Sequence, residues 1–155
     1  MIKANVVHDD RYYMRLAIKE ANKAKKKDEV PVGCIIVQGE KIITRAHNQK
    51  ERRKNALMHA EVLAIMRASR RLRRWRLSDC TLFVTLEPCP MCMGAIVSAR
   101  FGRVVYGASD PKAGACGSVY DINQGGLNHT VTVTGGVMKD ECAAILSGYF
   151  RGKRK

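Results

Sequence analysis

Strand-like runs and amphipathic helical runs alternate along this chain, and that alternation limits the fold class. Apolar residues recur at helical spacing over residues 11–27, 59–71, 89–99 and 142–150, and β-rich runs lie at 32–37, 41–46, 81–86, 103–106 and 130–134. The turn Gln38-Gly39-Glu40 predicts an antiparallel hairpin, whereas later strands separated by helices require parallel crossovers. The sequence therefore predicts an α/β domain with three layers, α/β/α, around a mixed five-stranded sheet.

One domain accounts for the whole sequence. No linker, internal repeat or low-complexity segment interrupts the 155 residues, so we expect residues 1–155 to bury a common core without disulfides. The polar, basic stretch 48–55 and the glycine-rich stretches 114–117 and 125–126 are predicted loops. No apolar run approaches the roughly 18 residues of a membrane span, and residues 1–10 lack the apolar core of a signal peptide. We therefore expect a cytoplasmic protein without membrane association.

Positive charge is concentrated in the middle of the chain. Residues 45–76 contain 11 basic and 2 acidic residues, which is +9 of the net charge of +14. A surface that binds a polyanion concentrates cations in this way, because each neutralised phosphate releases counterions. Nucleic acid is the partner that this pattern favours. The alternative is a solvated basic helix face, above all for the cluster formed by Arg67, Arg70, Arg71, Arg73, Arg74 and Arg76.

Two short motifs combine residue types that bind zinc. His59 precedes Cys89 by thirty positions, and Cys92 follows three residues later. Either motif alone is ambiguous, because a lone histidine is often structural and a lone C-x-x-C can be a redox pair. Together they supply one imidazole and two thiolates and leave the fourth position of a tetrahedral Zn²⁺ open, which predicts one catalytic zinc ion per subunit. The other cysteines lack such spacing, and Cys34 and Cys142 are predicted core residues.

Both motifs fall where helices are predicted to begin. Unpaired backbone amides and the positive end of the helix dipole stabilise thiolates there. Glu61 lies two residues after His59, close to the metal but directed differently, so it can transfer protons between an activated water and a substrate. The alternative for Glu61 is a charge that merely favours the helix dipole.

A longer series of motifs resembles one family. The series comprises Glu29-Val30-Pro31-Val32-Gly33, Ala46-His47-Asn48, His59-Ala60-Glu61, Trp75-Arg76-Leu77, Thr85-Leu86-Glu87-Pro88-Cys89-Pro90-Met91-Cys92, Val105-Tyr106-Gly107-Ala108, Asp110-Pro111-Lys112, Asn128-His129 and Tyr149-Phe150-Arg151. It spans nearly the whole chain and resembles the bacterial tRNA-specific adenosine deaminases of the cytidine deaminase-like zinc deaminase superfamily, whose members share the H-x-E and P-C-x-x-C signature. The resemblance implies the cytidine deaminase-like form of the α/β/α fold.

The resemblance also implies a reaction and a set of site residues. The reaction is hydrolytic deamination of the wobble adenosine of a tRNA anticodon to inosine, typically in an arginine tRNA, by a homodimer. His59, Cys89 and Cys92 match the zinc ligands, and Glu61 matches the proton shuttle. The residues matching the substrate contacts are Asn48, Val32, Ala60 and Leu86 around the flipped base, and Asp110, Lys112, Asn128, Phe150 and Arg151 around the flanking nucleotides of the anticodon stem-loop. Without the resemblance, Asn48 would be a turn residue and Phe150 a core residue.

Three other functions share parts of this pattern. A deaminase of a free nucleobase or nucleotide, of guanine or cytosine type, would use the same catalytic residues but would not need the basic segment. A zinc module that binds RNA without catalysis would need a fourth protein ligand. An altered deaminase could act on single-stranded DNA, although Asp110, a potential acceptor for a ribose 2′-OH, favours RNA.

Overall fold

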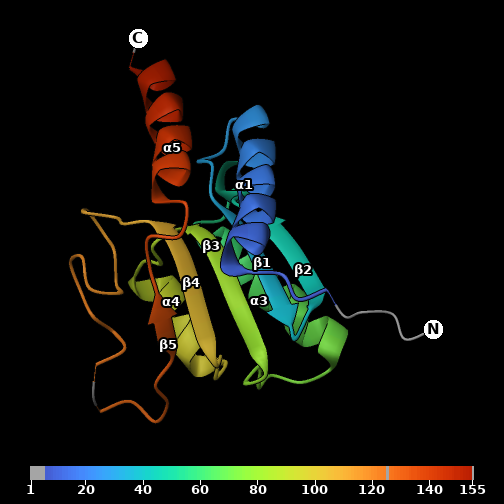
Figure 1. The fold of residues 1–155 in the computed structure, drawn as a ribbon. Helices are drawn as coiled ribbons and strands as arrows, with labels where there is room; N and C mark the ends of the chain where they lie inside the picture. The colour runs from blue at the N-terminus through green and yellow to red at the C-terminus, as the bar shows by residue number, and fades with distance from the viewer. Residues whose placement is uncertain (1–5, 125, 155) are drawn as a thin grey trace.

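The computed structural model describes residues 6–124 and 126–154 and shows three layers (Figure 1). The elements in chain order are α1 (Asp10–Lys26), β1 (Gly33–Gln38), β2 (Lys41–His47), α2 (Lys50–Arg53), α3 (Ala60–Leu72), β3 (Cys80–Leu86), α4 (Pro90–Ser98), β4 (Arg103–Ala108), β5 (Thr132–Thr134) and α5 (Lys139–Lys153). Every predicted helix and strand is present, with bounds shifted by a few residues. Gly125 of the predicted 125–126 turn lies outside the described residues.

The sheet has the predicted mixed topology. Its strand order is β2-β1-β3-β4-β5. Strand β1 is antiparallel to β2 and to β3, whereas β3, β4 and β5 are parallel to one another. Gly39 turns the β1–β2 hairpin with a φ of +59°, a conformation that glycine adopts without steric cost.

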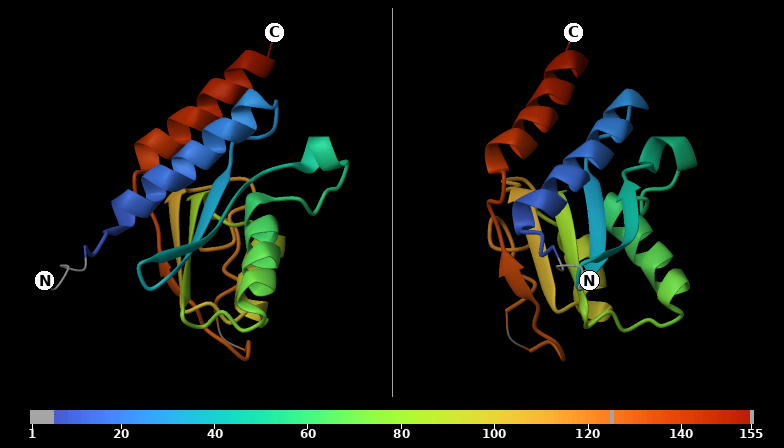
Figure 2. Two further views of the ribbon diagram at one scale, coloured as in Figure 1. Left: turned by 90° about the vertical axis from the view of Figure 1, so that its right-hand side faces the viewer. Right: turned by 45° about the vertical axis from the view of Figure 1, so that its right-hand side comes forward.

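Helices cover both faces of the sheet. Helices α1 and α5 pack on one face and helices α3 and α4 on the other (Figure 2). Along β1, Cys34 and Ile36 face the α3 and α4 layer, while Ile35 and Val37 face α1. This alternation follows from the two-residue period of a strand, and it forms a separate apolar cluster on each face. The three-layer prediction is therefore confirmed.

The short helix α2 corrects one prediction, because the sequence predicts only a loop over residues 48–55. Four residues are too few to form a helix on their own propensity. A tertiary contact supplies the missing stabilisation: the buried carboxylate of Glu29 accepts hydrogen bonds from the backbone N–H groups of Glu51 at 2.9 Å and Arg52 at 2.8 Å. Because these partners are far apart in sequence, no local sequence pattern predicts the helix.

Half of the arginine cluster is engaged within the fold. Strand β2 lies at an edge of the sheet. Arg67 and Arg71 of α3 donate hydrogen bonds, each of 2.9 Å, to the carbonyl oxygens of Arg45 and Ile43 on that strand. Arg74 pairs with Asp79 at 2.7 Å. These three guanidinium groups therefore have structural partners that the sequence does not reveal.

The six cysteines are free and form no disulfide bond. Cys34 and Cys142 are buried, which confirms their assignment to the core. Within residues 6–124 and 126–154, no helix has both the length and the apolar character needed to cross a bilayer.

Candidate metal centre and nucleobase pocket

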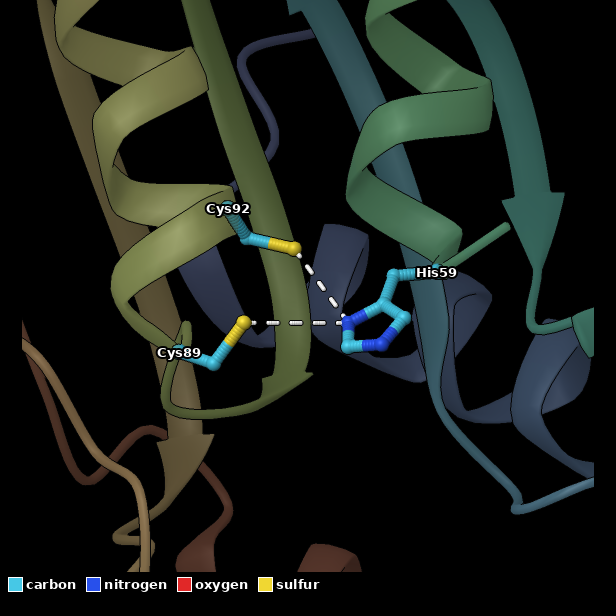
Figure 3. A group of neighbouring side chains, drawn as sticks. All are labelled: His59, Cys89 and Cys92. Atoms are coloured by element: carbon cyan, nitrogen blue, oxygen red, sulfur yellow. Dashed lines mark hydrogen bonds between the residues drawn. The ribbon is translucent and has the colours of Figure 1, made fainter. Parts of the chain in front are cut away.

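The three predicted zinc ligands meet between the first turns of two helices. His59 is the N-cap of α3 and Cys89 is the N-cap of α4, while Cys92 lies one turn into α4. Figure 3 shows their side chains directed at one another. The Nδ1 atom of His59 lies 3.7 Å from Sγ of Cys89 and 3.5 Å from Sγ of Cys92. The crossovers of the sheet thus bring together two motifs that are far apart in sequence.

These separations fit a shared tetrahedral ion. With Zn–S bonds of about 2.3 Å and Zn–N bonds of about 2.0 Å, tetrahedral angles require a separation of about 3.5 Å between nitrogen and sulfur. The two observed separations, 3.5 and 3.7 Å, match that requirement without any movement of the backbone. Among the described residues, these three alone form a group of metal-binding type, so a fourth position would remain for a non-protein ligand.

The local electrostatics favour a cation. Hydrogen bonds from the Cys92 thiol and from His59 lower the pKa of Cys89 to about 4. The contact with Cys89 raises the pKa of Cys92 and that of His59. Negative charge is therefore concentrated on sulfur at the start of α4, where a divalent cation can replace the shared protons.

Glu61 lies beside this group in a cavity of about 280 Å³, lined among others by His59 and Cys89. Glu61 is buried and only 4% exposed. Burial raises the pKa of its carboxyl group above the usual range, which makes Glu61 a better base near neutral pH. The carboxylate is thus suited to proton transfer in this cavity.

Asn48 combines a structural bond with a free polar group. Its Oδ1 accepts a hydrogen bond of 2.7 Å from the backbone N–H of Ala60 at the start of α3. Because that oxygen is committed, the Nδ2 group is the part of the amide available to the cavity, which Asn48 lines together with Val32 and Leu86. The residue thus caps a helix and offers a donor to a ligand.

A second cavity of about 570 Å³ adjoins the first. The two share Val30, Leu86 and Asp110 in their linings, and the second extends along α5. It contains Lys112, Phe150 and Arg151, three of the predicted contacts to flanking nucleotides. Phe150 is 44% exposed, so it offers an apolar surface to a ligand rather than packing in the core.

Two predicted substrate residues lie outside both cavity linings. Ala60 has a fully buried side chain, and its N–H is donated to Asn48. Asn128 is exposed in the loop between β4 and β5, next to His129, whose Nε2 bonds to the carbonyl oxygen of Phe101.

Two buried glutamates at the cavity were not predicted as functional. Glu29 and Glu87 are 1% and 2% exposed, and both line the nucleobase cavity. Each accepts hydrogen bonds from backbone N–H groups distant in sequence, Glu29 from those of helix α2 and Glu87 from those of the loop at residues 110–118. Their one signal in the sequence is an acidic residue one or two positions before a proline, near the border of an apolar strand.

The fold and the site together define a nucleobase deaminase of the cytidine deaminase-like class, with one histidine, two cysteines and a neighbouring glutamate. The model of the MafB19-like deaminase family matches residues 8–154. The tRNA-specific adenosine deaminase of Bacillus subtilis (strain 168) is 48% identical over 147 residues, which cover 94% of this chain and 91% of that protein. The chain belongs to the MafB19-like deaminases and to the family of tRNA-specific adenosine deaminases.

Solved structures agree with this assignment. A structure from studies of A-to-I editing by tRNA:A34 deaminases at the wobble position of transfer RNA has a TM-score of 0.83 and 40% identity, and the match covers 87% of this chain and 99% of the other. A guanine deaminase from Nitrosomonas europaea has a TM-score of 0.78 at 22% identity over 95% of this chain and 87% of the other, which shows the common fold alone. The predicted fold class and family are confirmed.

Proposed function

We propose that this chain is a zinc-dependent hydrolase that converts adenosine to inosine at the wobble position of a tRNA anticodon. The observation that carries the proposal is the metal-binding geometry of His59, Cys89 and Cys92 beside a buried glutamate. The similar proteins that are named for tRNA adenosine deamination support the same substrate.

The chemistry divides between the metal and Glu61. His59, Cys89 and Cys92 would hold the zinc ion, which would lower the pKa of a water molecule from about 15.7 to about 7. Glu61 would accept a proton from the attacking water and deliver it to N1 of adenine as the water oxygen bonds to C6. It would then move the proton of the new C6 hydroxyl to the exocyclic amine, so that the C6–N bond breaks and one water is consumed and one ammonia released for each inosine formed. Burial of Glu61 excludes bulk water that would otherwise exchange these protons.

The cavity suits a single flipped base. Its volume of about 280 Å³ lies near the lower end of the range of roughly 300–1,000 Å³ for ligand pockets. The Nδ2 group of Asn48 would donate to a ring nitrogen of adenine, and Val32 and Leu86 would contact the faces of the base.

The adjoining cavity would take the neighbouring nucleotides. Lys112 and Arg151 provide cations for phosphates, and Phe150 provides a surface for stacking. The Oδ1 atom of Asp110 accepts bonds from the N–H groups of Lys112 and Ala113, so its other oxygen would accept from a ribose 2′-OH. We propose that Asn128 contacts the anticodon loop from outside these cavities.

The finer features of the resemblance belong to the same proposal: an arginine tRNA as substrate, one catalytic domain over residues 1–155, action in the cytoplasm, and a homodimer. The apolar side chains of Leu57 and Met66, each 54% exposed, are consistent with a protein interface beside α3. Light scattering of the purified protein would test the dimer.

An inosine assay on an anticodon stem-loop, with zinc measured in the same samples, tests the function. Wild type should form inosine, whereas Glu61→Gln should lose at least ~100-fold in rate while keeping its zinc, because proton transfer by a positioned side chain contributes about 10²–10⁴-fold. Normal deamination by Glu61→Gln would refute the mechanism. Equal activity on free nucleosides and on RNA would instead identify a deaminase of small molecules.

A further inference from the structure

Glu87 is a buried carboxylate that the proposed chemistry does not use. It follows Leu86 at the end of β3 and is 2% exposed. Its oxygens accept hydrogen bonds from the backbone N–H groups of Asp110 at 3.1 Å, Cys116 at 2.9 Å and Ser118 at 3.2 Å, and also from the Ser118 hydroxyl. A carboxylate has about four lone-pair sites, so these four donors leave Glu87 no capacity for proton transfer.

The loop of residues 109–118 is closed tightly around this carboxylate. A Cβ atom added to Gly114 would lie 2.4 Å from Cδ of Glu87 and 2.5 Å from each of its oxygens. A larger residue at position 114 would therefore displace the Glu87 carboxylate from the donors that it binds. The backbone N–H of Ala115 also donates to the carbonyl oxygen of Pro88 at 2.8 Å, next to Glu87 in sequence.

The same loop supplies walls to both cavities. Asp110 and Ala113 line the nucleobase cavity, and Asp110, Pro111 and Lys112 line the adjoining one. Residues 117–120, at the end of this loop and just beyond it, are exposed, whereas Gly114 and Ala115 are buried. The bonds to Glu87 therefore connect a partly exposed loop to the end of a central strand.

We propose that Glu87 is a positioning residue for substrate binding: it fixes the loop of residues 109–118 so that the nucleotides beside the flipped adenosine meet preformed contacts. This inference rests on the proposed function. A preordered loop lowers the entropic cost of RNA binding, so the benefit falls on affinity rather than on the chemical step. None of the three ligand residues belongs to the loop, so we expect its loss of order to leave zinc binding intact.

Glu87→Gln tests the inference, because the amide retains the size of the side chain but directs an NH₂ group at backbone donors. We expect a KM for the anticodon stem-loop at least tenfold higher, a single-turnover rate at saturating RNA within threefold of wild type, and an unchanged zinc content. Hydrogen exchange at the amides of Cys116 and Ser118 should accelerate, which is a readout independent of activity.

Glu20→Gln is the matched control. Glu20 is also buried, at 4% exposure, but it lies on α1, bonds to His47 and Lys23, and lines neither cavity. It should leave the KM and the exchange of the loop amides unchanged. An equal rise in KM in both variants would overturn the proposal, because the effect would then reflect lost stability.

Two further variants keep the test informative if Glu87→Gln does not fold. Ser118→Ala removes one of the four donors and should raise the KM severalfold, and Gly114→Ala should reproduce the Glu87→Gln pattern from the opposite side of the contact. A KM within twofold of wild type in both would refute the positioning role. Failure of wild type to deaminate the stem-loop would instead refute the proposed function.

Discussion

Arg52, Arg53, Arg70 and Arg74 all belong to the basic segment of residues 45–76, whose charge pattern favours nucleic acid as the partner. We predict that only the first two contact RNA. Replacing Arg52 and Arg53 with glutamine should raise the KM for the anticodon stem-loop and flatten its salt dependence. The matched double replacement of Arg70 and Arg74 removes the same charge and should leave both quantities close to wild type.

The structure separates these pairs. Arg52 lies in α2 and lines a cavity that shares Glu51 and Tyr149 with the nucleobase cavity. Arg70 is in the last turn of α3, and with a rise of about 1.5 Å per residue it lies about 16 Å along the helix from His59. Figure 2 shows α3 running away from α2 toward the opposite end of the molecule. Arg74 is held by Asp79 at 2.7 Å.

Counterion release gives the expected magnitude. Each phosphate contact to single-stranded nucleic acid contributes about 0.7 to the slope of log affinity against log salt. If Arg52 and Arg53 each contact one phosphate, the slope should fall by about 1.4. The ratio of the variant's KM to the wild-type KM should then shrink about sevenfold between 50 and 200 mM salt. The assay is inosine formation under steady-state conditions at several KCl concentrations, with zinc content as the control for folding.

Two results would refute this reasoning. An equal loss of slope in both double variants would mean that net charge acts at long range regardless of position. An unchanged slope in the Arg52 and Arg53 variant would mean that the basic segment is a solvated surface without a role in RNA binding.

Three further predictions concern the site and its support. Asn48→Asp keeps the oxygen that caps α3 but loses the Nδ2 donor, so kcat/KM should fall at least ~10-fold with an unchanged melting temperature, whereas Asn48→Ala should also lose about 1 kcal/mol of stability. The hydrogen bond with His47 lowers the pKa of Glu20 from 4.5 to about 2. The charged form therefore stabilises the fold above pH 4.5, by at most about 3 kcal/mol, and this contribution is lost as the pH falls toward 2. Urea titrations of Glu20→Gln should show a flatter acid limb, and an acid limb identical to wild type would contradict it. Chelation should abolish deamination and lower the melting temperature, with both restored by Zn²⁺; unchanged melting would show that the metal contributes nothing to stability.

The fold could be predicted from the sequence because its signals are local. Alternation in runs such as 32–37 reveals strands, and the three-to-four-residue spacing of Met14, Ala17 and Ala21 reveals α1. The metal ligands could be predicted because His59 and the C-x-x-C pair of Cys89 and Cys92 combine residue types and a spacing that suit zinc. The structure then shows that the ligand atoms come within reach of one ion.

Other features depend on contacts between residues distant in sequence and could not be predicted. Helix α2 exists because Glu29 binds its N–H groups from more than twenty residues away. Glu87 is separated by a similar length of chain from the loop that it fixes. A buried acidic residue carries no periodic signal, so its partners become visible only in three dimensions.

The hydrogen bonds from Arg67 and Arg71 to β2 have a consequence for aggregation. An edge strand with free carbonyl groups is a template for strands of other molecules, and proteins protect such edges with charged side chains. Here two arginines occupy acceptors of the edge directly. Replacing both with alanine, for example to reduce the net charge, would expose a pairing-competent strand. Part of the basic character that suggests RNA binding thus protects the β2 edge against pairing with strands of other molecules.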